Sequence, residues 1–322
     1  MTKRQISRAA GVIAAALVLI WFKACKPADD AQTPQQPQKQ EQQYSTNPVQ
    51  VLPSDANSVK VGTFNVAWLG DGTRDRTDRT EEDYRLIADV IAQANPDVLG
   101  IEEIENGAAV ERVLKYLPGY KYFVGEKGAA QNVGVLFKNE ITVTPVGEYM
   151  PVSVRPGRTR PGYVVNCKKG NFDWLMMTVH FKSTSRYDST AAMRDSARTL
   201  RTEQAGAVSR WADSLLKNGR EKDLIIVGDF NDFPRRKANP SLTPILSNSA
   251  LEFLTYDTRS CWKGALYSID QVLITRSTKS RFKTGSEQLY NFNSSLTKKQ
   301  AQKVSDHCPV MVQFDVTAKD ND

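Results

Sequence analysis

The sequence is poor in histidine and cysteine, and beyond its first residues it is nearly neutral in charge. Only two of its 322 residues are histidine and four are cysteine, and the cysteine spacing matches no zinc motif. The first 25 residues carry four basic and no acidic residues, which leaves 39 basic and 36 acidic residues, or +3, for the rest. This balance gives little support to a polyanion partner, so any basic surface has to be local.

The apolar run near the N-terminus is too short to cross a bilayer comfortably. It covers residues 9–22, follows a basic start and precedes Cys25. At a helical rise of about 1.5 Å per residue such a run spans less than a hydrocarbon core of about 30 Å, whereas its length is typical of a signal peptide. The placement of Cys25 resembles a bacterial lipoprotein signal, in which that cysteine is lipidated. We therefore expect residues 1–25 to be a signal peptide, with uncleaved membrane anchoring as the alternative.

Residues 26–57 offer little that a folded core could bury. Eight glutamines and three prolines lie between Ala31 and Gln50, a composition that predicts a disordered tether. We expect an exported protein, either a membrane-anchored lipoprotein in the periplasm or on the cell surface, or a secreted one. Membrane contact is expected only through the lipid anchor. No protein partner is indicated, and a monomer is expected.

Three cysteines remain beyond Cys25, namely Cys167, Cys261 and Cys308. An odd number in an oxidising compartment permits one disulfide and one free thiol. The sequence does not choose the pair.

Residues 58–317 alternate β-rich runs with amphipathic helical patterns, and residues 318–322 form a short tail. Several strands lack an intervening helix, as between Gly119 and Phe181, which favours mixed or antiparallel sheets over a doubly wound parallel sheet. We expect an α/β domain in which two packed sheets are flanked by helices. The expected strands are residues 59–66, 97–104, 133–138, 173–181, 223–230, 268–275 and 309–316, and the expected helices are residues 81–94 and about 191–217.

Polar side chains recur where these apolar runs end. A single Asp at such a place usually caps a turn, and a single His there is more often structural. Six such strand ends in one chain instead favour a shared site, although Glu102 and Glu103 point to opposite faces of a strand, so at most one of them enters it. The residues are Asn65, Glu102, Glu103, His180, Asp229, Asn231, Asp270, Asp306 and His307.

In their order and spacing, the motifs around these residues resemble the endonuclease/exonuclease/phosphatase superfamily, and within it the secreted deoxyribonucleases. The motifs are GTFNV, PDVLGIEEIE, VGVLFK, TVHFKS, VGDFND, SIDQVLI and SDHCPV, and the likeness runs from about Val61 to Phe314. The resemblance implies a four-layered α/β sandwich with two mixed β-sheets packed between helices. It also implies metal-dependent hydrolysis of phosphoesters.

Carried over to this chain, the resemblance implies a metal site at Glu103, with Asn65 nearby and Asp306 able to join it. The ion is expected to be Mg²⁺ or Mn²⁺, with Ca²⁺ as a further option, because a set of few oxygen ligands suits a hard cation that keeps water and phosphate oxygens in its shell.

The same resemblance implies the catalytic roles. His307 would be the general base that activates water, and Asp270 would orient it. Asp229 and Asn231 would position the nucleophile and the phosphate. His180 would donate to a phosphate oxygen in the transition state.

Substrate contacts are expected from two basic segments. Lys182 follows His180, and Arg158 and Arg160 lie in the loop of residues 155–162. Each of these side chains contacts a substrate phosphate or is simply solvated, and the sequence leaves both readings open. Arg198, Arg201 and Glu203, on the long helix, are expected to form surface pairs.

The predicted function is therefore an exported nuclease that hydrolyses phosphodiester bonds of DNA or RNA by metal-assisted attack of water, with nucleic acid as the substrate. An alternative is a phosphatase or phosphodiesterase acting on small or lipid phosphoesters such as inositol phosphates or sphingomyelin. A more distant alternative is a surface lipoprotein that keeps the fold and binds without catalysis.

Overall fold

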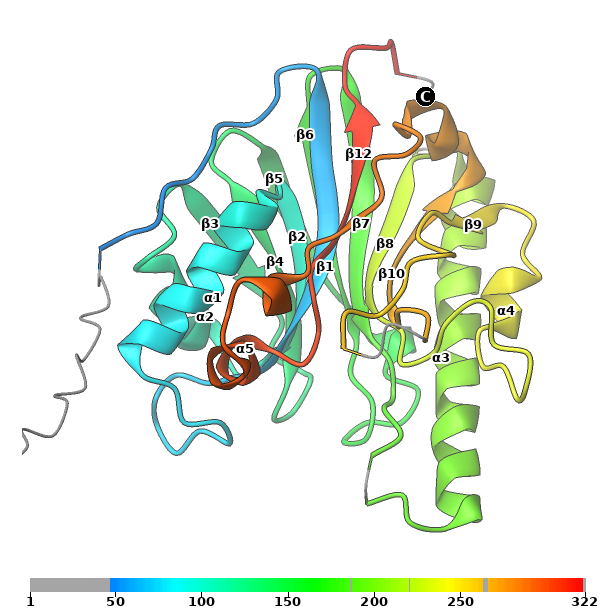
Figure 1. Ribbon diagram of the computed structural model, residues 1–322. Helices are drawn as coiled ribbons and strands as arrows, with labels where there is room; N and C mark the ends of the chain where they lie inside the picture. The colour runs from blue at the N-terminus through cyan, green and yellow to red at the C-terminus, as the bar shows by residue number, and fades with distance from the viewer. Residues whose placement is uncertain (1–46, 186, 220, 263–265, 321–322) are drawn as a thin grey trace, which may run out of the picture. The chain divides into compact units, whose positions relative to one another are not determined.

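The computed structural model describes residues 47–320 except 186, 220 and 263–265 (Figure 1). The predicted signal peptide, with Cys25, and most of the predicted tether lie outside the described residues. Within the described residues, no helix combines the length and apolar character needed to span a bilayer. The chain contacts the domain earlier than predicted: Val49 is buried, and its N–H donates to the Tyr116 carbonyl at 2.8 Å. Residues 47–57 thus pack on the domain instead of belonging to the tether.

Two mixed sheets of six strands form the centre of the fold. The strands are β1 (Ser58–Leu69), β2 (Val98–Ile104), β3 (Tyr120–Val124), β4 (Asn132–Lys138), β5 (Thr142–Tyr149), β6 (Gly162–Lys169), β7 (Phe172–His180), β8 (Leu224–Asp229), β9 (Leu251–Phe253), β10 (Asp270–Thr275), β11 (Gln288–Leu289) and β12 (Val310–Asp315). The first sheet has the order β11-β12-β1-β2-β4-β3 and the second β5-β6-β7-β8-β10-β9. Each has one parallel pair, β1–β2 or β7–β8, between antiparallel neighbours.

Helices cover the outer face of each sheet, as Figure 1 shows. The α-helices are α1 (Glu81–Ala94), α2 (Gly107–Leu114), α3 (Ala191–Asn218), α4 (Thr243–Leu246) and α5 (Lys298–Val304), with 3-10 turns η1 (Met150–Val152), η2 (Arg276–Arg281) and η3 (Phe292–Ser294). One hydrophobic cluster lies between the sheets, a second under α1 and α2, and a third under α3 and α4. Burial of apolar side chains between all four layers stabilises this arrangement. The predicted four-layered α/β sandwich is therefore confirmed.

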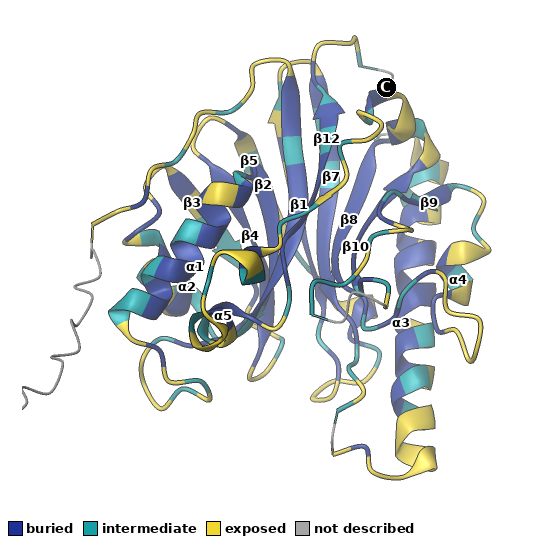
Figure 2. Cartoon of the chain, viewed as in Figure 1, coloured by how far each residue is buried: buried dark blue, intermediate teal, exposed yellow. Residues whose placement is uncertain are grey.

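The two predicted helices form where their caps place them. Thr80 and Asp83 make a capping box at the start of α1, and Asn95 ends it in a left-handed conformation just before Pro96. Thr190 caps α3, and Gly219 ends it at φ +66°. The first turns of α3 are mostly exposed (Figure 2), so this helix packs on the sheet mainly through its later residues.

The structure corrects one expectation about the surface and settles another about the cysteines. Arg201 does not form a surface pair: it is buried, and its Nη1 donates to the Lys182 carbonyl at 2.8 Å and to Thr184 Oγ1 at 2.9 Å. Cys261 and Cys308 form a disulfide, while Cys167 is a buried free thiol.

Candidate active site

The strand register places the polar strand ends side by side. In the second sheet Asp229 pairs with His180 on β7 and with Asp270 on β10, so three neighbouring strands present these side chains at one edge. In the first sheet Asn65 on β1 pairs with Glu102 on β2. The site therefore lies where these strand ends of the first sheet meet those of the second sheet.

Asn65 links the two sheets through its side chain. Its Nδ2 donates to Asp229 Oδ2 at 3.2 Å and to Glu103 Oε1 at 3.4 Å, and its Oδ1 accepts the Ala67 N–H at 3.0 Å. The side chain is fully buried. In this arrangement Asn65 holds the two carboxylates of the site at a fixed separation.

Glu103, and not Glu102, enters the site. The Glu103 side chain is 18% exposed, and its Oε2 accepts the Trp68 N–H at 3.1 Å. Glu102 is fully buried, accepts a hydrogen bond from Thr63 Oγ1 at 2.6 Å, and burial raises its pKa well above the ordinary value. The expectation that at most one of the two would enter the site is borne out by this geometry.

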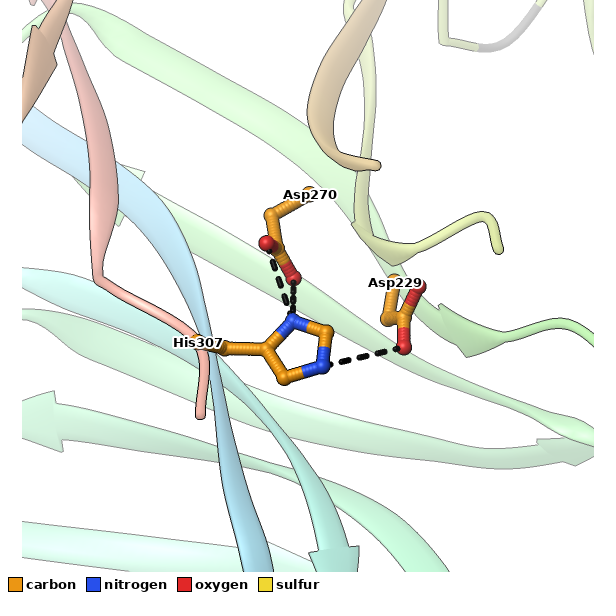
Figure 3. A group of neighbouring side chains, drawn as sticks. All are labelled: Asp229, Asp270 and His307. Carbon is orange, nitrogen blue, oxygen red and sulfur yellow. Dashed lines mark hydrogen bonds and ion pairs between the residues drawn. The ribbon is translucent and has the colours of Figure 1, made fainter. Parts of the chain in front are cut away.

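His307 and Asp270 form a hydrogen-bonded pair (Figure 3). The Nδ1 atom of His307 lies 2.9 Å and 3.0 Å from the two Asp270 carboxylate oxygens, while Nε2 lies 3.9 Å from Asp229 Oδ2. Burial by itself would lower the pKa of His307, but Asp270, Asp229 and Asp306 outweigh it and raise this pKa well above the ordinary value. Asp270 thereby fixes the ring orientation and leaves Nε2 as the atom available for chemistry.

His180 and Asn231 stand on either side of Asp229. His180 Nε2 lies 3.5 Å from Asp229 Oδ2, and burial lowers the pKa of His180 well below its ordinary value, so the ring is neutral. Asn231 has φ +50° and donates its N–H to Asp229 Oδ1 at 2.8 Å and its Nδ2 to Oδ2 at 3.1 Å. Asp229 is thus bonded by amides on both oxygens.

A cleft of about 470 Å³ opens over these side chains. Its lining residues are Ala67, Trp68, Arg76, Thr77, Glu103, His180, Ser183, Asp229, Asn231, Gln302, Asp306 and His307. Of the predicted site residues, Asn65 and Asp270 do not line the cleft but hydrogen-bond to residues that do. Asn65 bonds to Asp229, and Asp270 bonds to His307. Asp306 stands at the rim with its side chain 78% exposed, 3.9 Å from His307 Nε2.

The donor set fits a hard divalent cation. Burial, with Asp270 and Glu103 nearby, raises the pKa of Asp229 to about 7, and burial also raises the pKa of Glu103. Carboxylates gathered in this way repel one another, and a cation relieves that repulsion. Glu103, Asp229 and Asp306 all line the cleft, and their carboxylates are oxygen ligands of the kind that such an ion accepts.

Asp229, Asp270 and His307 also form a cluster whose ligand atoms lie within 4.8 Å of one another. We do not assign the ion to this cluster, because His307 Nδ1 already occupies both Asp270 oxygens. Asp270 and His307 are better described as an acid–base pair beside the carboxylates that would hold the ion.

The two candidate loop arginines have different surroundings. Arg160 donates through Nη2 to Gln131 Oε1 at 2.8 Å and through Nη1 to the His180 carbonyl at 3.4 Å, whereas Arg158 is exposed. Lys182 is half-buried, and its Nζ donates to the Ser183 carbonyl at 2.7 Å. The structure therefore brings Arg160 to the site and leaves Arg158 at the surface.

Three buried polar atoms around His180 lack a hydrogen-bond partner among the described residues. They are Nδ1 of His180, Nε of Arg160 and Nε2 of Gln131. Buried polar atoms without partners are rare in folded proteins, and these three belong to residues that Arg160 joins through its contacts with Gln131 and with the His180 carbonyl. Gln131 was not predicted, because a lone glutamine in a loop carries no sequence signal.

Arg79 and Trp68 were also missed. Arg79 is buried, and its guanidinium donates to the carbonyls of Val66, Ala67 and Trp68 at 2.6–2.9 Å and to that of Lys303 at 2.8 Å. It ties the end of β1 to the end of α5, which leads into His307. An arginine in a charged stretch reads as a solvated residue, so only the contacts reveal this role.

A family model described as "Endonuclease/Exonuclease/phosphatase family" matches residues 62–307. No match is found among curated protein sequences.

Solved structures with the same fold come from animals and bacteria. TDP2 from Caenorhabditis elegans has a TM-score of 0.58 at 16% identity, over 81% of this chain and 100% of the other. The mannosyl-6-phosphatase of Bacteroides thetaiotaomicron has a TM-score of 0.55 at 16% identity, over 79% and 98%. The human nocturnin catalytic domain, with bound sulfate, has a TM-score of 0.55 at 15% identity, over 80% and 94%. At these identities the likeness shows the fold alone.

The extent of the family match and the shared fold lead to one assignment: the chain belongs to the endonuclease/exonuclease/phosphatase family, whose members hydrolyse phosphoesters.

Proposed function

We propose that the protein is an exported phosphodiesterase that uses Mg²⁺ or Mn²⁺, and that nucleic acid is its substrate. The observation that carries the proposal is the arrangement of the His307–Asp270 pair, Asp229 and Glu103 around one cleft. A base, a carboxylate pair for a cation and neutral donors for phosphate are the parts that metal-assisted hydrolysis of a phosphoester needs.

In the proposed mechanism Glu103 and Asp229 would hold the cation, which would supply Lewis-acid polarisation of the phosphoryl group. His307, in its neutral form, accepts a proton from the attacking water at Nε2, and Asp270 holds the resulting imidazolium through Nδ1. His180, neutral and buried, donates to a phosphate oxygen as charge builds there, and Arg160 adds a positive charge beside it. Asn231 and Asn65 keep Asp229 in place.

Nucleic acid is favoured over small esters by the arginines around the site. Arg76 lines the cleft and Arg160 borders it, and Arg155 lies farther along the same loop as Arg160, beside the first half of α3. Positive charge beside a phosphoesterase cleft suits a chain of phosphates. The formal charge of only +3 beyond residue 25 and the fold shared with a mannosyl-6-phosphatase favour the second candidate, hydrolysis of a small phosphomonoester.

The deciding experiment measures hydrolysis of plasmid DNA, bis(p-nitrophenyl) phosphate and a set of sugar and inositol monophosphates by residues 47–322. Glu103→Gln and His307→Ala, each expected to lower kcat at least 100-fold, are run beside wild type with and without chelator. Cleavage of plasmid and diester supports the proposal. Cleavage of monoesters alone favours the phosphatase, and chelator-resistant activity contradicts the metal requirement. No hydrolysis of any ester points to the non-catalytic binding lipoprotein.

We also propose that residues 1–25 direct export and that Cys25 carries a lipid. The basic start and the apolar run before Cys25 support this. In a bacterial host the full chain should fractionate with membranes, whereas Cys25→Ser should release it from them. A variant that stays membrane-bound would indicate anchoring by the uncleaved apolar run.

A further inference from the structure

The backbone at Trp68 has a conformation that side-chain-bearing residues rarely adopt. Ala67 and Trp68 have φ values of +50° and +60°, in the left-handed region. Such positions persist where the surroundings hold them, and they gather at functional sites. Here the Trp68 N–H donates to Glu103 and its carbonyl accepts from the buried Arg79. The fold thus fixes both ends of the Trp68 peptide next to the proposed metal ligand.

Trp68 lines the cleft, and its side chain has no role in the proposed hydrolysis. The guanidinium carbon of Arg76 lies 4.2 Å from the centroid of the indole ring, and Arg76 also lines the cleft. Thr77 and Gln302 also line the cleft. An aromatic surface next to a positive charge therefore lies in the same cleft as Glu103, His180 and His307.

This combination suits a planar group attached to a phosphate. Nucleobases stack on aromatic side chains whatever their identity, since every base has a π-face. Arg76 can stack with a base or pair with a neighbouring phosphate. A sugar without a base, or an alkyl group, offers no comparable face to the ring.

We propose that Trp68 and Arg76 form a subsite for the nucleobase next to the scissile phosphate, so that the preferred substrate is a phosphodiester carrying a nucleoside. The inference rests on the proposed phosphodiesterase function and adds the group that the site recognises.

The experiment compares three diesters with the same leaving group: the 5′- and 3′-(p-nitrophenyl phosphates) of thymidine, and methyl p-nitrophenyl phosphate. Wild type should prefer at least one thymidine ester. Trp68→Ala should lower kcat/KM for that ester about 5-fold to 150-fold, mainly through KM, because stacking of one base contributes that much. The methyl ester should change less than about twofold, and Trp68→Phe should restore most of the loss.

Tyr256→Ala is the matched control. Tyr256 is an exposed ring that also lies under an arginine, Arg235 at 5.5 Å, but it lines no part of the cleft. The Tyr256→Ala variant should hydrolyse all three esters with unchanged kcat/KM. A parallel loss on thymidine and methyl esters in Trp68→Ala would make Trp68 a structural residue, and a wild type without preference for the thymidine esters would overturn the proposal.

If wild type hydrolyses none of the three esters, that result counts against the proposed phosphodiesterase function. The nucleobase subsite is then tested by binding alone. Calorimetric titration in Mg²⁺ with thymidine 5′-monophosphate and deoxyribose 5-phosphate needs no turnover. A preference for the nucleotide that disappears in Trp68→Ala would support the subsite. Equal affinities in wild type, or tighter binding of the sugar phosphate, would refute it.

Discussion

At the residue scale, the candidate site and the strands that carry it contain residues with unusual backbone conformations or unusual burial. Glu103 and Asn231 have φ values of +62° and +50°, and Glu102 is a carboxyl buried between the sheets. Departures of this kind cost stability and are kept where the surrounding structure holds them. The buried carboxyl of Glu102 gives the first prediction.

Glu102 should make the domain less stable as the pH rises. Its pKa in the folded protein lies well above the ordinary value of 4.5 because of burial, so above pH 4.5 the unfolded chain loses this proton before the folded one does. The stability is full below that pH and falls as pH rises toward the folded pKa, by at most about 1.4 kcal/mol per pH unit for one proton.

Glu102→Gln cannot ionise, so it should gain stability over wild type as pH rises. The difference in the free energy of unfolding, measured in urea at pH 5 and pH 8, should be larger at pH 8. A change at the exposed Glu126 should leave this pH dependence as it is. A difference between Glu102→Gln and wild type that is the same at both pH values would contradict a raised pKa at Glu102.

Arg160 and Arg158 lie in one loop and should behave differently. Arg160 is held beside His180 by Gln131, whereas Arg158 is exposed. Hydrogen bonds to charged groups contribute about 1.5–3 kcal/mol, so Arg160→Ala should lower kcat/KM for bis(p-nitrophenyl) phosphate about 10-fold to 100-fold. Arg158→Ala, the matched control, should change it less than about threefold. Equal losses in both variants would mean that the loop acts only through its net charge.

At the element scale, the ends of β1 and α5 meet at Arg79. The guanidinium fork reaches carbonyls on both of them, and Ser305, just after α5, donates from Oγ to the Asn65 carbonyl at 2.6 Å and accepts the His307 N–H. The disulfide from Cys308 to Cys261 fixes the far side of the same segment. His307 is therefore positioned by contacts before and after it.

Arg79→Ala should unfold at lower urea concentration, with a loss of about 2–4 kcal/mol, since buried carbonyls lose their donors. Arg79→Lys keeps the charge but lacks the planar fork, so it should fold and still lose about 10-fold to 100-fold in kcat through misplacement of the site. Arg85→Lys, on the outer part of α1, is the control. A variant that loses stability without losing kcat per folded molecule would show that Arg79 has no positioning role.

At the scale of the whole molecule, the sequence predicts the fold well where strands are buried and the helices long. All seven expected strands and both expected helices are present with bounds shifted by few residues. Of the unexpected strands, β3, β9 and β11 are short, whereas β6 is long and mostly buried. In β5 no residue is buried and Pro145 interrupts the pattern, so neither periodicity nor β-propensity marks it.

The site was predictable only as far as its residues adjoin apolar runs. His180 and Asp229 end such runs, whereas Asp270 and His307 stand just before them; the register brings His180, Asp229 and Asp270 together, and His307 joins them through Asp270. Trp68 lies near the irregular end of β1, whereas Arg79 and Gln131 sit in loops, and the places of all three depend on left-handed backbone and on contacts between distant segments. A local sequence pattern does not contain such information. The sequence therefore indicated the candidate catalytic residues but not Trp68, Arg79 or Gln131.

Charge over the whole molecule gives the last prediction. The chain beyond residue 25 is nearly neutral, so attraction of a polyanion has to come from arginines at the cleft such as Arg76 and Arg160. If about three phosphates of a single strand are neutralised, the logarithm of kcat/KM should fall with the logarithm of salt concentration with a slope of roughly −2. Cleavage of an oligonucleotide should then slow about 15-fold between 50 and 200 mM salt, while bis(p-nitrophenyl) phosphate should change less than about twofold. Arg76→Ala should make the slope shallower by about 0.7. An equal salt dependence for both substrates would show that only one phosphate is held, which is what an enzyme for small esters requires.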